Sequence, residues 1–256
     1  MRRKKNKEIE WLEFDLLADI HELTHGVILR HGGCSQGPFA TLNAGGSPSD
    51  DDPENIQKNR EKILTNFSIS NYVLGKQMHG ANVEVVPPLS TQVETDCDGL
   101  ITQKKGLALL VRHADCQAAI FYDPIHQILG NVHCGWRGNV KNIYEKTIQK
   151  MQSLGACKKD ILVCISPSLG PHASQFINYK SELPESFLSF QIKPLYFNLW
   201  EISRHQLEEA GILRHHIEIA SICTHANKQD FYSYRRDKPT GGHITLAAMR
   251  ESIDFK

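Results

Sequence analysis

The sequence has no excess of charge of either sign and no long apolar run. Lysine plus arginine and aspartate plus glutamate number 29 each in the 256 residues, so net charge provides no general attraction to nucleic acid or to an anionic membrane. No uninterrupted apolar segment approaches the roughly 20 residues that a membrane-spanning helix needs. We therefore expect neither nucleic acid nor a membrane as a partner.

The cysteines also lack a familiar pattern. There are seven, an odd number, and no two of them form a Cys-x-x-Cys pair. This argues against thioredoxin-like redox chemistry and against ribbon-type structural zinc. No apolar segment of the secretory type follows the basic start at Met1 to Lys7, so we expect reduced thiols and a cytoplasmic location. We expect residues 1–15 to form a flexible basic tail and residues 16–256 to form a single domain.

Short apolar runs bounded by turn residues predict buried strands, and longer segments with apolar residues at helical spacing predict helices. Strands are expected from near residue 26 and at 71–75, 82–86, 107–111, 118–122, 128–132, 161–165 and 217–222. Helices are expected at 54–67, from about 140 to 154, at 199–210 and from about 246. The irregular alternation of these elements indicates an α+β fold with mixed sheets.

One thiol and two imidazoles lie at the ends of predicted strands. Cys116 lies between two apolar runs, His133 follows a third, and His79 lies in Gln77-Met-His-Gly80. Two histidines and one cysteine are a ligand set that leaves the fourth position of a zinc ion open for chemistry. A single cysteine on an apolar strand is nevertheless usually part of the core, and the long separations are no local ligand signature. From the residues alone, their convergence in space stays open.

Several arginines lie beside glycine-rich turns. Arg137 is at the start of a predicted helix, where it can bind an anion with the backbone N–H groups or pair with a carboxylate. Arg30, Arg60 and Arg235 lie in comparable contexts and can be surface charges or structural ion pairs. Several of them at one cleft would indicate a phosphate site.

Motifs spread over roughly residues 25–245 occur in the order found in one protein family. The chain resembles the laccase-domain family, also called polyphenol-oxidase-like, whose members are assigned as purine nucleoside phosphorylases. The motifs that carry the resemblance are Arg30-x-Gly-Gly-x-Ser35, Leu42-Asn43, Asn59-Arg60, Gln77-Met-His-Gly80, Asp98-Gly-Leu-Ile-Thr102, Ala114-Asp-Cys116, His133-x-Gly-Trp-Arg-Gly138, Ser168-Leu-Gly-Pro171, Cys223-Thr224 and Phe231-Tyr-Ser-Tyr-Arg-Arg-Asp237.

The resemblance implies a single domain with a layered α/β/β/α sandwich fold. It also implies a metal site, for zinc or copper, built from His79, Cys116 and His133. Implied catalytic residues are Cys116, His133 and Asp115. Implied substrate-binding residues are Arg30, Asn43, Arg60, Arg137 and Arg235.

The activity implied by the resemblance is phosphorolysis of adenosine, inosine and methylthioadenosine, with deamination of adenosine as a side activity. The chain departs from the family pattern at His113, Ser166, Asn198 and Gly242, so its purine or ribose pocket can differ. Three alternatives use the same residues: a copper phenol oxidase, a hydrolase with Cys116 as nucleophile, and a metal-binding partner protein without catalysis.

Overall fold

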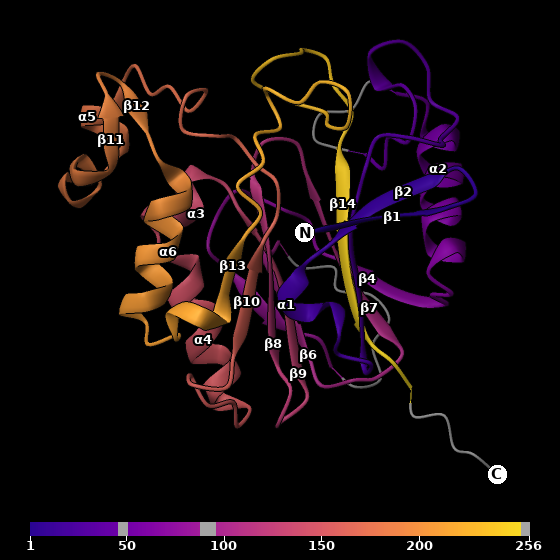
Figure 1. Cartoon of the computed structure of the whole chain (residues 1–256), viewed down its shortest axis with the longest axis horizontal. Helices are drawn as coiled ribbons and strands as arrows, with labels where there is room; N and C mark the ends of the chain where they lie inside the picture. The colour runs from indigo at the N-terminus through magenta and orange to yellow at the C-terminus, as the bar shows by residue number, and fades with distance from the viewer. Residues whose placement is uncertain (46–50, 88–95, 252–256) are drawn as a thin grey trace.

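Two mixed β-sheets stack face to face, with helices on both outer sides (Figure 1). The computed structural model describes residues 1–45, 51–87 and 96–251. Each sheet has six strands, and parallel and antiparallel pairs occur in both. This architecture confirms the predicted α+β fold with mixed sheets. Within the described ranges, no helix has both the length and the apolar character needed to cross a membrane.

The first sheet has the strand order β1-β2-β3-β14-β7-β4. Its strands are Arg2–Asn6 (β1), Ile9–Glu13 (β2), Leu23–Ile28 (β3), Asn71–Leu74 (β4), Leu107–His113 (β7) and His243–Met249 (β14). Helix α2 (Pro53–Asn66) covers its outer face, where Ile63 packs in one cluster with Leu110 and Leu246. The side chain of Asp52 caps this helix by accepting the N–H group of Glu54, as the turn sequence before it favours.

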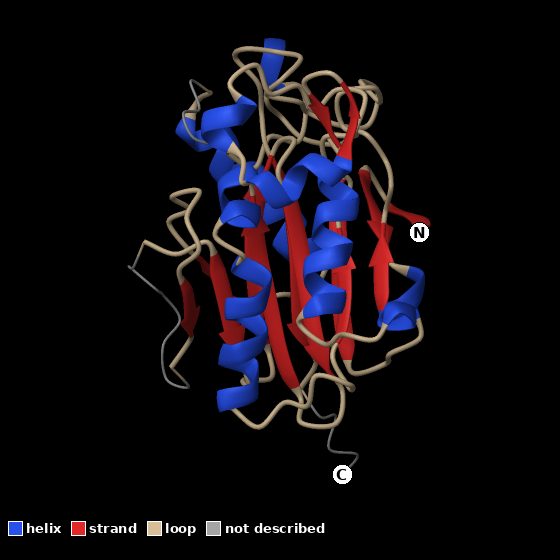
Figure 2. Cartoon of the chain, turned by 90° about the vertical axis from the view of Figure 1, so that its left-hand side faces the viewer, coloured by secondary structure: helices blue, strands red, loops and turns tan. Residues whose placement is uncertain are grey.

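The second sheet has the strand order β13-β10-β8-β9-β6-β5. Its strands are Val83–Val85 (β5), Gly99–Thr102 (β6), Gln117–Asp123 (β8), Ile128–Cys134 (β9), Leu162–Ile165 (β10) and Ile217–Ile219 (β13). Helices α3 (Trp136–Val140), α4 (Ile143–Ser153) and α6 (Leu199–Glu209) lie on its outer side. Figure 2 shows helices in front of these strands. The apolar side of α4, with Ile148 and Met151, packs in one cluster with strand residues such as Phe121.

The remaining elements are short. They are α1 (Asp15–Ala18), α5 (Tyr179–Glu182), the strands β11 (Gln191–Lys193) and β12 (Tyr196–Phe197), and the 3-10 helices η1 (Gly37–Phe39), η2 (Glu185–Phe190) and η3 (Arg214–His216). The strands β11 and β12 form a separate two-stranded sheet, and Phe197 of β12 packs in one cluster with Phe176.

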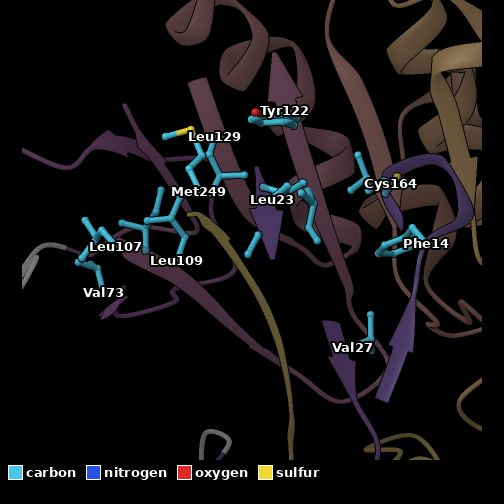
Figure 3. Packing of buried hydrophobic residues seen from close by; sticks show 14 of the residues in the cluster. Phe14, Leu23, Val27, Val73, Leu107, Leu109, Tyr122, Leu129, Cys164 and Met249 are labelled. Atoms are coloured by element: carbon cyan, nitrogen blue, oxygen red, sulfur yellow. The ribbon is translucent and has the colours of Figure 1, made fainter. Parts of the chain in front are cut away.

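The main core lies between the two sheets (Figure 3). Leu109 and Met249 of the first sheet pack in one cluster with Tyr122 and Leu129 of the second, and all four are fully or almost fully buried. A polar contact joins the sheets at the same level, because the amide group of the buried Asn131 donates to the backbone oxygens of Leu109 and Thr245 at 2.8 and 3.0 Å. These contacts fix β7 and β9 relative to each other, and with them the side chains at their ends.

The structure differs from prediction in the first residues of the chain. The segment predicted as a flexible basic tail forms the antiparallel pair β1 and β2. The basic side chains have partners: Arg2 donates to Asp15 and Asp19, and Arg3 donates to Glu10 and Asp230. Paired charges on one strand and two buried apolar residues on the next favour the sheet over a solvated tail.

The prediction of a helix from about residue 246 is wrong. Residues 243–249 form β14, which pairs antiparallel with both β3 and β7 in the middle of the first sheet. All seven of its residues are buried. A short apolar run of this kind is compatible with a helix or a buried strand, and the two neighbouring strands decide the outcome here.

Candidate metal centre

The structure brings His79, Cys116 and His133 together. One potential ligand atom of each residue lies within 4.8 Å of those of the other two. Cys116 directly precedes β8 and His133 is the second-last residue of β9, and these two strands pair with Gln117 opposite Cys134. This register places the thiol beside the imidazole of His133. His79 arrives from the loop between β4 and β5, with its ring 4.8 Å from that of His133, centroid to centroid.

Asp98 orients two of the three potential ligands. Its Oδ1 accepts from His133 Nδ1 and from the backbone N–H of His79, both at 2.9 Å. Its Oδ2 accepts from the backbone N–H groups of Gly80 and Met78, at 2.7 and 3.3 Å. With Nδ1 of His133 carrying the proton donated to Asp98, Nε2 is the nitrogen available to a metal.

Three consecutive N–H groups around one carboxylate form an anion-binding turn. This turn requires a left-handed backbone at His79, whose φ is 55°. Such a conformation is unfavourable for a residue with a Cβ atom. The hydrogen bonds to Asp98 compensate for it and therefore fix the position of His79.

Replacing Asp98 by asparagine is expected to lower zinc affinity roughly 10- to 100-fold. The amide NH₂ group cannot accept the hydrogen bonds that one carboxylate oxygen now receives, so either the turn at His79 or the contact to His133 is lost. Zinc affinity would be measured by competition with a chromophoric chelator. Asp96→Asn is the matched control, because Asp96 is exposed and pairs only with Lys76 among the ion pairs of the described chain. Equal zinc affinity in Asp98→Asn and in the control would contradict this role.

The charges at the centre favour a thiolate. Burial opposes ionisation of Cys116, but the charge of His133 and hydrogen bonds from both imidazoles outweigh it and lower the pKa of the thiol. Burial likewise disfavours the charged form of His133, yet the neighbouring thiolate and Asp98 raise the pKa of that imidazole. Burial of Asp98 is outweighed by the hydrogen bonds from His133 and Gly80, which lower its pKa. A cation bound between the three side chains would find a thiolate already formed.

The local backbone fits a metal ion. A Cβ atom added to Gly135 would lie 3.1 Å from Cys116 Sγ, 3.5 Å from His79 Cδ2 and 4.0 Å from His133 Cε1. The absence of a side chain at this position therefore leaves free space that all three residues border. One sulfur and two nitrogen donors are a ligand set that zinc accepts. These residues fit a metal ion, and the donor set does not by itself distinguish zinc from copper.

The centre opens into a cavity of about 260 Å³. This is slightly smaller than the roughly 300–1,000 Å³ of most small-molecule sites. Besides the three potential ligands, the cavity is lined by Gln77, Arg112, His113, Ala114, Tyr234, Thr240, Gly241 and Gly242. A larger cavity of about 640 Å³ lies beside His21, His25 and Asn66 and contains none of the three. We regard the smaller cavity as the candidate active site, because Cys116 and His133, whose pKa values are shifted, line it.

Three of the predicted substrate-binding residues support the loops around this cavity. Arg30 donates to the backbone oxygen of Ala40 and stacks on the ring of Tyr232 at 4.4 Å. Asn43 accepts the N–H group of Gly242, which lines the cavity. Arg60 donates from Nε to the backbone oxygen of Ala44, and burial lowers its pKa. None of the three lines the cavity itself.

Arg137, Arg235 and Asp115 also lie outside the cavity lining. Arg137 is exposed and stacks on Trp136, with the guanidinium carbon 4.1 Å from the ring centroid. The carboxylate of Asp115 accepts from the Thr224 hydroxyl and from the backbone N–H of Arg235, both at 2.6 Å. Asp115 has a φ of 83°, so it forms the turn that presents Cys116.

Several residues at the site have no role predicted from sequence, among them Asp98, Gln77 and Arg112. The side chain of Gln77 both donates to and accepts from the backbone of Arg112, at 2.7 and 2.9 Å, which ties the His79 loop to the end of β7. The position of Arg112 in the sequence indicates that it is near the site, because it precedes His113 at the end of a predicted strand, close to the Ala-Asp-Cys motif.

Known proteins are similar to this chain over most of its length. A family model described as "Multi-copper polyphenol oxidoreductase laccase" matches residues 24–250. A protein of Bacteroides thetaiotaomicron named purine nucleoside phosphorylase is 28% identical over 264 residues, which cover 95% of this chain and 97% of that protein. One of Geobacillus stearothermophilus named purine nucleoside phosphorylase YlmD is 31% identical over 240 residues, covering 86% and 87%. The crystal structure of YlmD from Geobacillus stearothermophilus matches with a TM-score of 0.85 and 27% identity, covering 97% of this chain and 98% of that one.

Proposed function

We propose that this chain, which belongs to the family described as multi-copper polyphenol oxidoreductase laccase, is a metal-dependent purine nucleoside phosphorylase that also deaminates adenosine. Its proposed substrates are adenosine, inosine and methylthioadenosine, each together with phosphate. The observation that carries the proposal is the convergence of His79, Cys116 and His133 at a cavity, in a chain whose relatives are named purine nucleoside phosphorylases.

The proposed role of each residue at the site follows from its contacts. His79, Cys116 and His133 would hold the metal, and zinc is the ion we propose. Bound zinc lowers the pKa of a coordinated water, which is the chemistry that adenosine deamination requires. Asp98 keeps the two histidines in place. Tyr234 lines the cavity with half of its side chain exposed, so its ring is available to stack on a purine base.

Two alternative functions have less support. A multicopper oxidase needs further copper ligands beyond a single site, and the only group of three or more potential ligands in the described residues is this one. A hydrolase with Cys116 as nucleophile is favoured by the lowered pKa of the thiol beside His133. The same thiolate would be consumed as a ligand in the metal-bound protein, so metal content separates the two hypotheses.

The test is to purify the full chain, determine its metal content, and incubate it with adenosine in the presence and absence of phosphate. We expect about one zinc ion per chain, adenine and ribose 1-phosphate only with phosphate, and inosine under both conditions. Removal of the metal with a chelator should stop turnover, and added zinc should restore it. A chain that contains zinc but forms no adenine with phosphate would refute the phosphorylase proposal.

A further inference from the structure

Arg112 is a half-buried arginine that has no counter-ion among the described residues. Its Nε atom is buried and has no hydrogen-bond partner in the structure, and no ion pair of the described chain includes its guanidinium. Burial and then the positive charge of Arg60 lower the pKa of Arg112. A partly buried guanidinium with an unpartnered Nε atom favours an anion as its partner.

Arg112 belongs to the candidate active site. Arg112 lines the same cavity as His79, Cys116 and His133. In β7 the side chain of Arg112 is on the same face of the sheet as those of Ala108 and Leu110, which pack toward α2. This placement explains why Arg112 approaches Arg60. Gln77 holds the backbone of Arg112 through two hydrogen bonds, so the position of the guanidinium is coupled to the His79 loop.

A second unpartnered group borders the cavity. Only 7% of Thr240 is exposed, and its buried hydroxyl has no hydrogen-bond partner in the structure. It begins the Thr240-Gly241-Gly242 segment, which lines the cavity and is held by Asn43. A buried hydroxyl without a partner is rare. An arginine and a hydroxyl that line one cavity supply donors suited to a phosphate oxyanion.

We propose that Arg112, together with the Thr240 hydroxyl, binds the phosphate co-substrate beside the metal centre. Naming phosphate as the anion depends on the proposed phosphorylase function. In that reaction a phosphate oxygen forms a bond to C1′ of the nucleoside while the bond from C1′ to N9 breaks. The base leaves with that electron pair and takes the proton of hydrogen phosphate, so the products are ribose 1-phosphate and the free base. Arg60 adds positive charge without contacting the anion.

The test measures binding of inorganic phosphate to the zinc-loaded full chain by titration calorimetry, without nucleoside. Arg112→Gln is expected to weaken phosphate binding roughly 10- to 100-fold, because it removes a charged bidentate donor. Zinc content and melting temperature should stay as in the wild type. Arg112→Lys should recover part of the affinity, since it restores the charge but not the fork. Arg204→Gln is the matched control, because Arg204 is a half-buried arginine on α6 that pairs with Glu201.

The outcomes separate this inference from the proposed function. Unchanged phosphate affinity in Arg112→Gln overturns the site, and so does a wild-type chain that does not bind phosphate at millimolar concentrations. Phosphorolysis with an unchanged KM for phosphate in Arg112→Gln refutes the site but leaves the function intact. Phosphate binding that depends on Arg112 in a chain without phosphorolysis supports the site and refutes the function. If Arg112→Gln does not fold, Thr240→Val is the variant that tests the site. We expect it to lower phosphate affinity several-fold, and an unchanged phosphate affinity would contradict the proposal.

Discussion

Replacing Cys116 by alanine is expected to abolish stoichiometric zinc binding and to reduce phosphorolysis by at least about 10³-fold, which corresponds to about 4 kcal/mol of transition-state stabilisation. Cys116 supplies the only thiolate of the triad. Burial lowers the pKa of His133, and the negative charge of Cys116 is the largest of the effects that raise it. Without it, two neutral imidazoles would have to hold a dication at the edge of an open cavity. Such a pair binds zinc much more weakly than three ligands with a thiolate.

The matched control for this variant is Cys157→Ala, which removes an exposed thiol outside the site. Zinc content would be determined by mass spectrometry of the purified chains, and phosphorolysis by the phosphate-dependent release of adenine. Unchanged turnover in Cys116→Ala would show that the reaction does not depend on this metal site. Full zinc content with no turnover would instead favour the thiol as nucleophile.

The strands were largely predictable from sequence because most are short apolar runs between turn residues. The runs at 107–111, 118–122 and 128–132 became β7, β8 and β9, each two residues longer. Residues 243–249 are the exception, because the sequence predicts a helix from about residue 246. That this segment is a strand depends on its pairing with β3 and β7, which are distant in sequence.

The three potential metal ligands were predictable from sequence, but their geometry was not. His79, Cys116 and His133 come from three segments, and only the register of β8 with β9 and the turn around Asp98 bring them together. Arg112 shows a different limit. The sequence reveals a charged residue at a strand end, but the lack of a partner for its guanidinium is a property of the packed structure.

Acid is expected to destabilise the fold between pH 6.5 and 5, well before the carboxylates become protonated, because of buried histidines outside the metal centre, two of which accept a backbone N–H group. His243 accepts the backbone N–H of Tyr232 at its Nε2 and contacts the oxygen of Ile28 with its Nδ1, so only the neutral form satisfies both. His25 accepts the N–H of Phe14 in the same way. Burial lowers the pKa of His243 to about 3 and that of His25 to about 4.

The direction in which stability changes with pH follows from proton uptake. Both folded-state pKa values lie below the unfolded value near 6.5, so between these values the unfolded chain binds more protons and stability rises with pH. The stabilisation is complete above about pH 6.5 and is lost as pH falls toward 4 and 3. Each histidine contributes about 1.4 kcal/mol per pH unit, so the pair costs about 4 kcal/mol at pH 5. That is a large part of the roughly 5–15 kcal/mol that stabilises most domains.

The measurement is urea unfolding at several pH values from 5 to 7.5, in the presence of a chelator so that the pH dependence of metal binding does not contribute. His243→Gln and His25→Gln should each reduce the slope of unfolding free energy against pH by about 1.4 kcal/mol per unit, because glutamine takes up no proton. His21→Gln is the control, since His21 is exposed and its removal should leave the slope unchanged. Equal slopes in all four proteins would mean that the two buried imidazoles become protonated without unfolding, against the hydrogen bonds that each accepts from the backbone.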